Sequence, residues 1–198
     1  MRDELLKQAI RIVVKIGSSL IASRSTGLRP DQIERLAGEI AALRADGREV
    51  LVVSSGAIVS GIKKLQLKEY PKSLPIKQAA AAVGQSRLMW AYERAFEPLG
   101  IQVAQIPLTH ADLADRRRFL NARYTLTALI GFGVLPIINE NDTVAVEEIR
   151  VGDNDTLAAQ VAQLVDADLL VILSDVDGMF TEDPRKNPEA TLIPLIPE

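Results

Sequence analysis

The stretch Arg11–Leu20, RIVVKIGSSL, places one lysine at the end of an apolar strand and directly before a Gly-Ser-Ser turn. An apolar residue at nearly every position is typical of a strand that helices cover on both faces of a parallel sheet. Lys15 is then either the polar end of this strand, reaching water, or a cation aimed at an anion beyond the sheet edge. The rest of the chain decides between these interpretations.

Further apolar runs follow the first one, and helical patterns separate them. Runs rich in Val, Ile and Leu predict strands at Val50–Val53, Ile101–Ile106, Val134–Ile138 and Leu169–Leu173. Apolar residues spaced three or four apart predict helices within residues 30–47, 79–96, 125–130 and 156–165. This alternation predicts an α/β fold, a three-layer α/β/α sandwich with a mainly parallel central sheet.

Four less regular stretches complete the prediction. Leu67–Pro75 (LKEYPKSLP) is typical of a surface loop, and Val144–Val151 (VAVEEIRV) alternates partly like a strand and suggests a β-hairpin. The charge run Asp115–Arg118 favours a solvated helix start or an ion-paired surface. His110 is expected at a loop or at the start of a helix. None of these stretches divides the chain into domains.

Composition excludes several classes of function. With 198 residues and 47% apolar content, the chain can bury a sizeable core. A net charge of −3 gives no basic field for nucleic acid or an anionic membrane. The absence of cysteine removes disulfides and thiolate sites, and one histidine cannot build a His-rich metal site. We therefore expect a cytoplasmic protein with no nucleic-acid or membrane partner and no metal site.

Four polar segments follow predicted strands, and a fifth, VGDND, precedes a predicted helix. They are KIGSS (Lys15–Ser19), SSGAI (Ser54–Ile58), NEND (Asn139–Asp142), VGDND (Val151–Asp155) and SDVDG (Ser174–Gly178). Because ligands of parallel α/β sheets bind outside the carboxyl ends of the strands, we expect these segments to form one site. The turn after Lys15 offers backbone amides suited to phosphate. Ser54–Ala57 suits a carboxylate, or is simply a helix cap and a tight turn.

The segment 139–155 is the most acidic of these. Glu147 and Glu148 are compatible with a solvated hairpin, whereas Asp142, Asp153 and Asp155 flank regular elements among Asn and Gly residues. Grouped carboxylates there suit an ammonium ligand, or the orientation of lysines that face a phosphate. The chain contains no G-x-x-x-x-G-K-[ST], G-x-G-x-x-G or G-x-S-x-G motif. A kinase built on this sequence would need a different phosphate site, and a hydrolase is disfavoured.

Seven segments together resemble the amino acid kinase family, over about Arg11 to Asn187. In chain order they are VVKIGSSLI, VVSSGAIVSG, KQAAAAVGQSRLM, RFLNARYTL, PIINENDTVA, VGDNDTLAA and SDVDGMFTEDPR. VKxGxS is common to the family, whereas AAVGQSRLM, RFLNAR and INENDxV resemble its glutamate-phosphorylating branch. The resemblance implies ATP-dependent phosphorylation of the γ-carboxylate of L-glutamate to γ-glutamyl phosphate, the first step of proline biosynthesis. The alternatives are a sibling kinase for another carboxylate or a nucleotide monophosphate, and a non-catalytic metabolite-binding fragment.

The resemblance also implies roles for the matched residues. Lys15 would bind the ATP phosphates and stabilise the phosphoryl group in transfer, and Asp153 would order the catalytic lysines. The phosphate-facing turn and the start of the nucleotide site would comprise Gly17, Ser18, Ser174 and Asp175. Glutamate would contact Ser55, Gly56, Ala57, Asp142, Asn154 and Asp155. The implied cofactors are ATP and Mg²⁺, with proline as a feedback inhibitor, and we expect a homo-oligomer.

The same resemblance implies further sequence beyond Glu198, which would carry a second catalytic lysine and most of the adenine site. Residues 1–198 are therefore expected to form a C-terminally truncated amino acid kinase domain. They would hold the glutamate-binding half and the start of the nucleotide-binding half. Many members of the family also carry a C-terminal RNA-modification-type domain, and the 198 residues include none.

Overall fold

The central sheet of the protein is parallel, as the apolar runs predict. The computed structural model describes residues 2–23, 25–145 and 153–196. Its five-stranded sheet has the order β5-β6-β4-β1-β7, and every pairing in it is parallel. The strands are β1 (Arg11–Ile16), β4 (Glu49–Ser54), β5 (Val103–Leu108), β6 (Leu135–Glu140) and β7 (Leu169–Leu173). All five strand predictions are confirmed, with small shifts at the ends.

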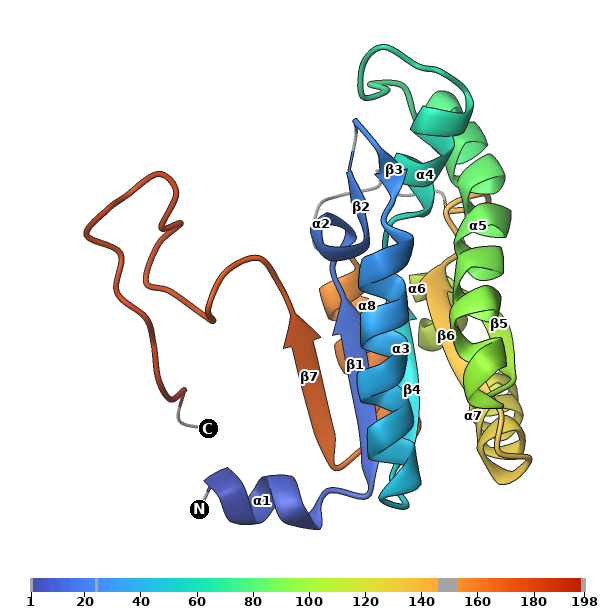
Figure 1. Cartoon of the computed structure of the whole chain (residues 1–198), viewed down its shortest axis with the longest axis vertical. Coiled ribbons are helices and arrows are strands. Elements are labelled where there is room, and N and C mark those ends of the chain that lie inside the picture. The colour runs from blue at the N-terminus through green and yellow to red at the C-terminus, as the bar shows by residue number, and fades with distance from the viewer. Residues whose placement is uncertain (1, 24, 146–152, 197–198) are drawn as a thin grey trace.

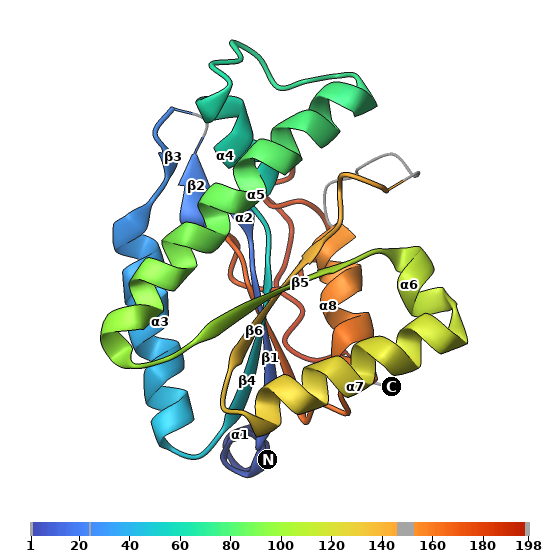
Figure 2. The same ribbon diagram turned by 90° about the vertical axis from the view of Figure 1, so that its right-hand side faces the viewer.

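Helices cover both faces of this sheet, which confirms the three-layer sandwich (Figures 1 and 2). On one side lie α3 (Pro30–Ala45) and α5 (Leu74–Phe96), with α4 (Ala57–Lys64) packed beside α5. On the other side lie α6 (His110–Ala114), α7 (Arg116–Gly131) and α8 (Asp153–Leu164). Smaller elements are α1 (Arg2–Gln8), α2 (Ser18–Ile21), the antiparallel pair β2 (Ala22–Ser23) and β3 (Gly27–Leu28), and a 3₁₀ turn at Glu97–Leu99.

The alternation of side chains along β1 decides where its lysine points. Ile12, Val14 and Ile16 pack into the core formed with α3 and α5. Val13 packs into the second core, formed with α7 and α8. Successive strand residues face opposite sides of a sheet, so Lys15 shares the face of Val13. The lysine is therefore directed to the layer that contains α8.

Two helices begin earlier than the apolar periodicity predicts. Helix α5 starts at Leu74, inside the stretch expected to be a loop, because Ser73 takes the N-cap position and the following proline is tolerated in the first turn. Helix α7 starts at Arg116, where the Asp115 side chain accepts a hydrogen bond from the Arg118 amide at 2.9 Å. The charge run is thus a helix start, as predicted, and His110 begins α6.

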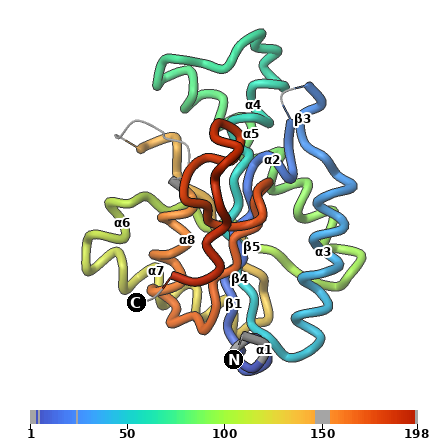
Figure 3. Tube along the Cα trace, turned by 90° about the vertical axis from the view of Figure 1, so that its left-hand side faces the viewer, coloured from blue at the N-terminus to red at the C-terminus, as the bar shows by residue number. Residues whose placement is uncertain are grey.

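The hairpin expected at Val144–Val151 lies, apart from its first two residues, outside the described part of the chain. After β7, residues 174–196 run away from the sheet on its β7 side, as Figures 1 and 3 show. A single antiparallel bridge joins Phe180 to Leu192 there. None of the helices in the described residues combines the length and the apolar character needed to cross a bilayer.

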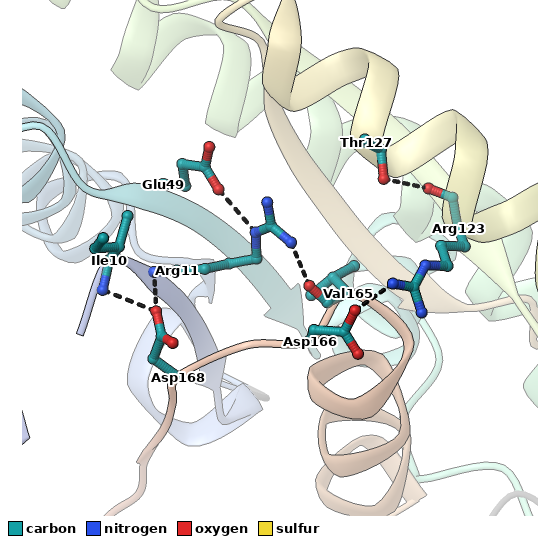
Figure 4. Close-up of polar contacts among 8 residues, drawn as sticks. All are labelled: Ile10, Arg11, Glu49, Arg123, Thr127, Val165, Asp166 and Asp168. Atoms are coloured by element: carbon teal, nitrogen blue, oxygen red, sulfur yellow. Dashed lines mark hydrogen bonds and ion pairs between the residues drawn. The ribbon is translucent and has the colours of Figure 1, made fainter.

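The amino ends of the central strands are fastened by a polar cluster (Figure 4). The Asp168 carboxylate accepts hydrogen bonds from the backbone amides of Arg11 at 2.7 Å and Ile10 at 2.9 Å, and these amides lower its pKa. The Arg11 guanidinium donates to the Glu49 carboxylate at 2.7 Å and to the Val165 carbonyl. This end of β1 is therefore occupied by protein contacts, whereas the opposite end borders a cavity.

Candidate active site

A cavity of about 390 Å³ lies at the carboxyl ends of the strands. The structure brings together around it residues of all five polar segments singled out in the sequence. Of the residues assigned to the site, those lining the cavity are Lys15, Gly17, Ser18, Ser55, Gly56, Ala57, Asp142, Asn154, Asp155, Ser174 and Asp175. Asp153 begins α8, but its side chain lies outside the described part of the structure.

Lys15 is buried and paired. Its residue is only 8% exposed, so the interpretation as a strand end reaching water is wrong. The ammonium Nζ lies 2.6 Å from Oδ1 of Asp155, in the first turn of α8. A buried charge is tolerated when a counter-charge lies close to it. The structure therefore holds a cation ready at the cavity, with Asp155 as the carboxylate that orients it.

The turn after Lys15 lets the chain approach β7 closely. The Gly17 amide donates to the Leu173 carbonyl at 3.1 Å, and a Cβ at Gly17 would lie 3.2 Å from that oxygen and 3.8 Å from the lysine Nζ. A side chain there would crowd both. The amides of Ser18 and Ser19 open α2, where backbone N–H groups have no acceptor within the helix. This turn fits an anionic group placed beside the lysine.

Asn154 connects three elements at the floor of the site. Its amide nitrogen lies 2.8 Å from Oγ of Ser55, 3.1 Å from Oδ1 of Asn139 and 3.2 Å from the Ser54 carbonyl. The first turn of α8 is thus tied to the ends of β4 and β6, while the buried Oδ1 atom of this asparagine lacks a hydrogen-bond partner among the described residues.

The segment after β4 forms the start of α4 and borders the cavity. Gly56 takes the N-cap position of α4 with φ of 106°, and no side chain caps the helix. The Ser54 hydroxyl instead shares a 2.8 Å hydrogen bond with the Tyr92 hydroxyl, and burial raises the pKa of that tyrosine. Gly56 thus adopts a left-handed conformation that favours glycine, and Gly56, Ala57 and Ile58 at the start of α4 line the cavity.

Helix α5 supports the site through residues to which the motifs assigned no role. Gly84 lets α4 approach, because a Cβ there would lie 1.7 Å from the Ala57 carbonyl oxygen. Gln85 accepts a 2.7 Å hydrogen bond from the Asn139 side chain, and Gln78 donates to the Ala145 carbonyl at 3.1 Å. The spacing within KQAAAAVGQSRLM could have indicated this role. The pairs KQ and GQ lie seven residues apart and therefore share one face of a helix.

The remaining acidic residues differ in their surroundings. Asp142 is buried at 8% exposure and lines the cavity. Asp175 pairs with Arg185 at 2.6 Å, and its own backbone amide together with that arginine lowers its pKa. Within the described ranges, no group of three or more His, Cys, Asp or Glu side chains is placed to hold a metal ion.

Comparison with known proteins adds the family context. The model of the amino acid kinase family matches residues 11–198. The chain is 55% identical to the glutamate 5-kinase of Pelobacter propionicus, 56% to that of Geobacter sulfurreducens and 58% to that of Geobacter metallireducens. Each alignment covers 99% of this chain and 52% of the relative. The chain thus spans about half the length of the curated relatives it matches.

A solved structure of low sequence identity shares the fold. The crystal structure of an isopentenyl phosphate kinase product complex from T. acidophilum superposes with a TM-score of 0.62 at 22% identity. The match covers 92% of this chain and 78% of that one. At this identity the likeness shows a common architecture and nothing about the substrate.

Proposed function

Because the chain belongs to the amino acid kinase family, we propose that the protein phosphorylates the γ-carboxylate of L-glutamate with ATP. The product would be γ-glutamyl phosphate, the first intermediate of proline biosynthesis. The observation that carries this proposal is the 55–58% identity to glutamate 5-kinases over nearly the whole chain. The cavity supports it by placing a buried cation among carboxylates and amides suited to an amino acid.

The chemistry needs alignment more than acid–base catalysis. A carboxylate is already a nucleophile at neutral pH, so no side chain has to remove a proton. Two anions must nevertheless approach each other, and neutralising their charge and holding them in line supplies most of the rate. Lys15 provides a buried positive charge for this purpose, and Asp155 holds its ammonium in place. A sibling kinase of the family would bind a phosphoryl acceptor other than glutamate in the corresponding part of the cavity.

The phosphate donor fits the turn beside Lys15. ATP with Mg²⁺ would supply the transferable phosphoryl group and further neutralisation of charge. Lys15, Gly17 and Ser18 would hold its phosphates, since the glycine permits close approach and the serine amide opens a helix. Ser174 and Asp175 would border the nucleotide on the β7 side.

The amino acid would occupy the opposite side of the cavity. Asp142 and the unpartnered Oδ1 of Asn154 would receive the ammonium group of glutamate. The segment Ser55–Ala57 would bind a carboxylate through the amides at the start of α4, which favour anions. Asp153 would help to order lysines at the site of transfer.

We assign residues 1–198 to the glutamate-binding half and the start of the nucleotide-binding half of the kinase domain. When several side chains act together in catalysis, an enzyme that lacks one of them can lose nearly all of its activity. The 198-residue chain should therefore bind glutamate without turnover, whereas a protein extended to the length of its relatives should release ADP when glutamate is present. ADP release by the short chain would contradict this division.

Binding selectivity tests the substrate directly. Titration calorimetry of the chain with L-glutamate, N-acetylglutamate, L-aspartate and uridine monophosphate should give measurable affinity for L-glutamate first of all. Preference for another ligand would favour a sibling kinase, and failure to bind any of them would refute the proposed function. Proline should compete, because it presents the same amino and carboxylate groups, and glutamate titrations at several proline concentrations would reveal this.

The proposal extends to the cellular compartment and the oligomeric state of the protein. The chain would work in the cytoplasm, where a protein without cysteine suits the reducing conditions. It would form a homo-oligomer, an assignment supported by exposed apolar side chains such as Trp90, Tyr124 and Phe132. Light scattering on the purified chain measures its molar mass in solution, and a monomer mass would contradict the homo-oligomer.

A further inference from the structure

Lys77 is a second lysine of the cavity, and no motif gave it a role. It is the fourth residue of α5 and lines the same cavity as Lys15 and Asp142. Its side chain is half-buried. Two ion pairs of the described residues lie at this cavity, Lys15 with Asp155 and Asp175 with Arg185. None of the ion pairs in the described ranges involves Lys77. Among the described residues, Lys77 therefore has no ion-pair partner, and its charge is available to a ligand in the cavity.

The local rules of helix formation do not account for this lysine. A cation in the first turn opposes the helix dipole, which favours acidic residues there. Lys77 also continues a buried face, because Ala81, Gly84 and Leu88 follow it at spacings of four, three and four residues and are buried. The lysine stands where this face reaches the cavity. A residue that breaks a local preference at such a point is expected to serve function.

The charges of the cavity match a ligand with two carboxylates. Lys15 lies at the phosphate-facing turn, and Asp142 with Asn154 suits an ammonium group, which leaves one carboxylate of glutamate without a cation. Resting on the proposed function, we propose that Lys77 binds the α-carboxylate and selects α-amino dicarboxylates over amino acids with one carboxylate. The amides of Ala57 and Ile58, at the start of α4, line the same cavity and would complete the binding of that carboxylate.

Helix α5 holds this cation at a fixed distance from the acidic groups. Backbone contact through Gly84 and Gly61 locks α5 against α4, since a Cβ at either glycine would lie 1.7 Å from a carbonyl oxygen of the other helix. Gln78, next to Lys77, bonds the Ala145 carbonyl and so fastens the segment that carries Asp142. The two charges are therefore carried by elements that are packed or bonded to each other, and we expect an amino acid with only one carboxylate to bind less well.

The test compares L-glutamate with 4-aminobutyrate, which keeps the amine and the γ-carboxylate but lacks the α-carboxylate. Calorimetric titration of the 198-residue chain and competition between the two ligands give both affinities. Lys77→Met should weaken glutamate binding about tenfold or more and leave 4-aminobutyrate unchanged, because only glutamate loses an ionic partner. Lys77→Arg should retain most of the affinity. Lys72→Met, in the exposed segment before α5, is the matched control and should change nothing.

The outcomes separate this inference from the proposed function. Glutamate binding that is unaffected by Lys77→Met would overturn the role of Lys77 and leave the substrate intact. An equal loss for both ligands, in a variant whose thermal unfolding is unchanged, would also overturn it, because the effect would not depend on the α-carboxylate. A parent chain that binds no glutamate would refute the proposed function itself, and this inference with it.

Discussion

Lys15, near the carboxyl end of β1, and Asp155, in the first turn of α8, form an ion pair of 2.6 Å, and their side chains differ in exposure. The lysine side chain is 10% exposed and the aspartate side chain 44%. If one partner is removed, the other must lie in the protein without its counter-charge. Because water reaches the carboxylate far more easily than the ammonium, the two deletions are not equivalent.

Asp155→Ala should therefore destabilise the chain more than Lys15→Met. Loss of the carboxylate strands a buried ammonium and should lower the free energy of unfolding by about 1–3 kcal/mol. Lys15→Met replaces the charge with an apolar chain of similar length, and the aspartate left behind is hydrated. Urea denaturation gives the free energy of unfolding of both variants. A larger decrease for Lys15→Met than for Asp155→Ala would contradict this explanation.

Gly84→Ala should disrupt the contact between α4 and α5. The new methyl group would lie 1.7 Å from the Ala57 carbonyl oxygen, so the helices must separate at a cost of about 1–3 kcal/mol or more. Gly38→Ala is the matched control, because it lies in α3 with no atom within 4 Å of the added methyl. This control should stabilise the chain by about 0.5–1 kcal/mol. If the melting temperature changed in the same direction in both variants, the close contact between α4 and α5 at Gly84 would be contradicted.

Gln85→Leu should weaken glutamate binding, although Gln85 acts through Asn139 and not by contact with the ligand. Asn139, which is buried, would lose the 2.7 Å acceptor of its side-chain amide, and about 1–3 kcal/mol of stability would be lost with it. Since Asn139 also accepts from Asn154, the floor of the site would shift. Ser86→Ala, at the exposed neighbouring position, serves as the control. Unaltered glutamate affinity in a destabilised Gln85→Leu chain would limit the network to a structural role.

The amino end of the sheet should give a pH-dependent contribution to stability. The amides of Arg11 and Ile10 hold the pKa of Asp168 below its value in the unfolded chain. Its carboxylate therefore stabilises the fold above the unfolded pKa of about 3.9, and this contribution is lost as the pH falls through the folded value. The difference in melting temperature between the parent and Asp168→Ala should be largest near neutral pH and shrink below about pH 4. A difference that persists in acid would show that the charge is not responsible.

The sequence predicts the sheet well because its signals are local. Runs such as Val50–Val53 are apolar throughout, and the polar turns at their ends identify the ligand-binding edge without knowledge of the strand order. Lys15 could be singled out for the same reason. Its burial could not be predicted, because that depends on the side-chain alternation of β1 and on the position of α8.

The supporting residues were harder to find because their partners are distant in the chain. Asn139 meets Gln85 across 54 residues, and Asn154 reaches Ser55 across 99. Such contacts leave no periodicity. The β2–β3 pair has strands of two residues each, too short for an alternating pattern, and the proline near the start of α5 resembled a loop signal.

The position of β1 between β4 and β7 has a consequence for synthesis of the chain on the ribosome. Ile12 of β1 pairs with Leu169 of β7, and the Arg11 amide bonds Asp168 across 157 residues. At translation rates of about 5–20 residues per second, some 10–30 s would pass before β7 leaves the ribosome. During this interval one edge of a strongly apolar strand has no partner. The nascent chain is therefore exposed to misplaced strand pairing along this edge until residue 173 emerges.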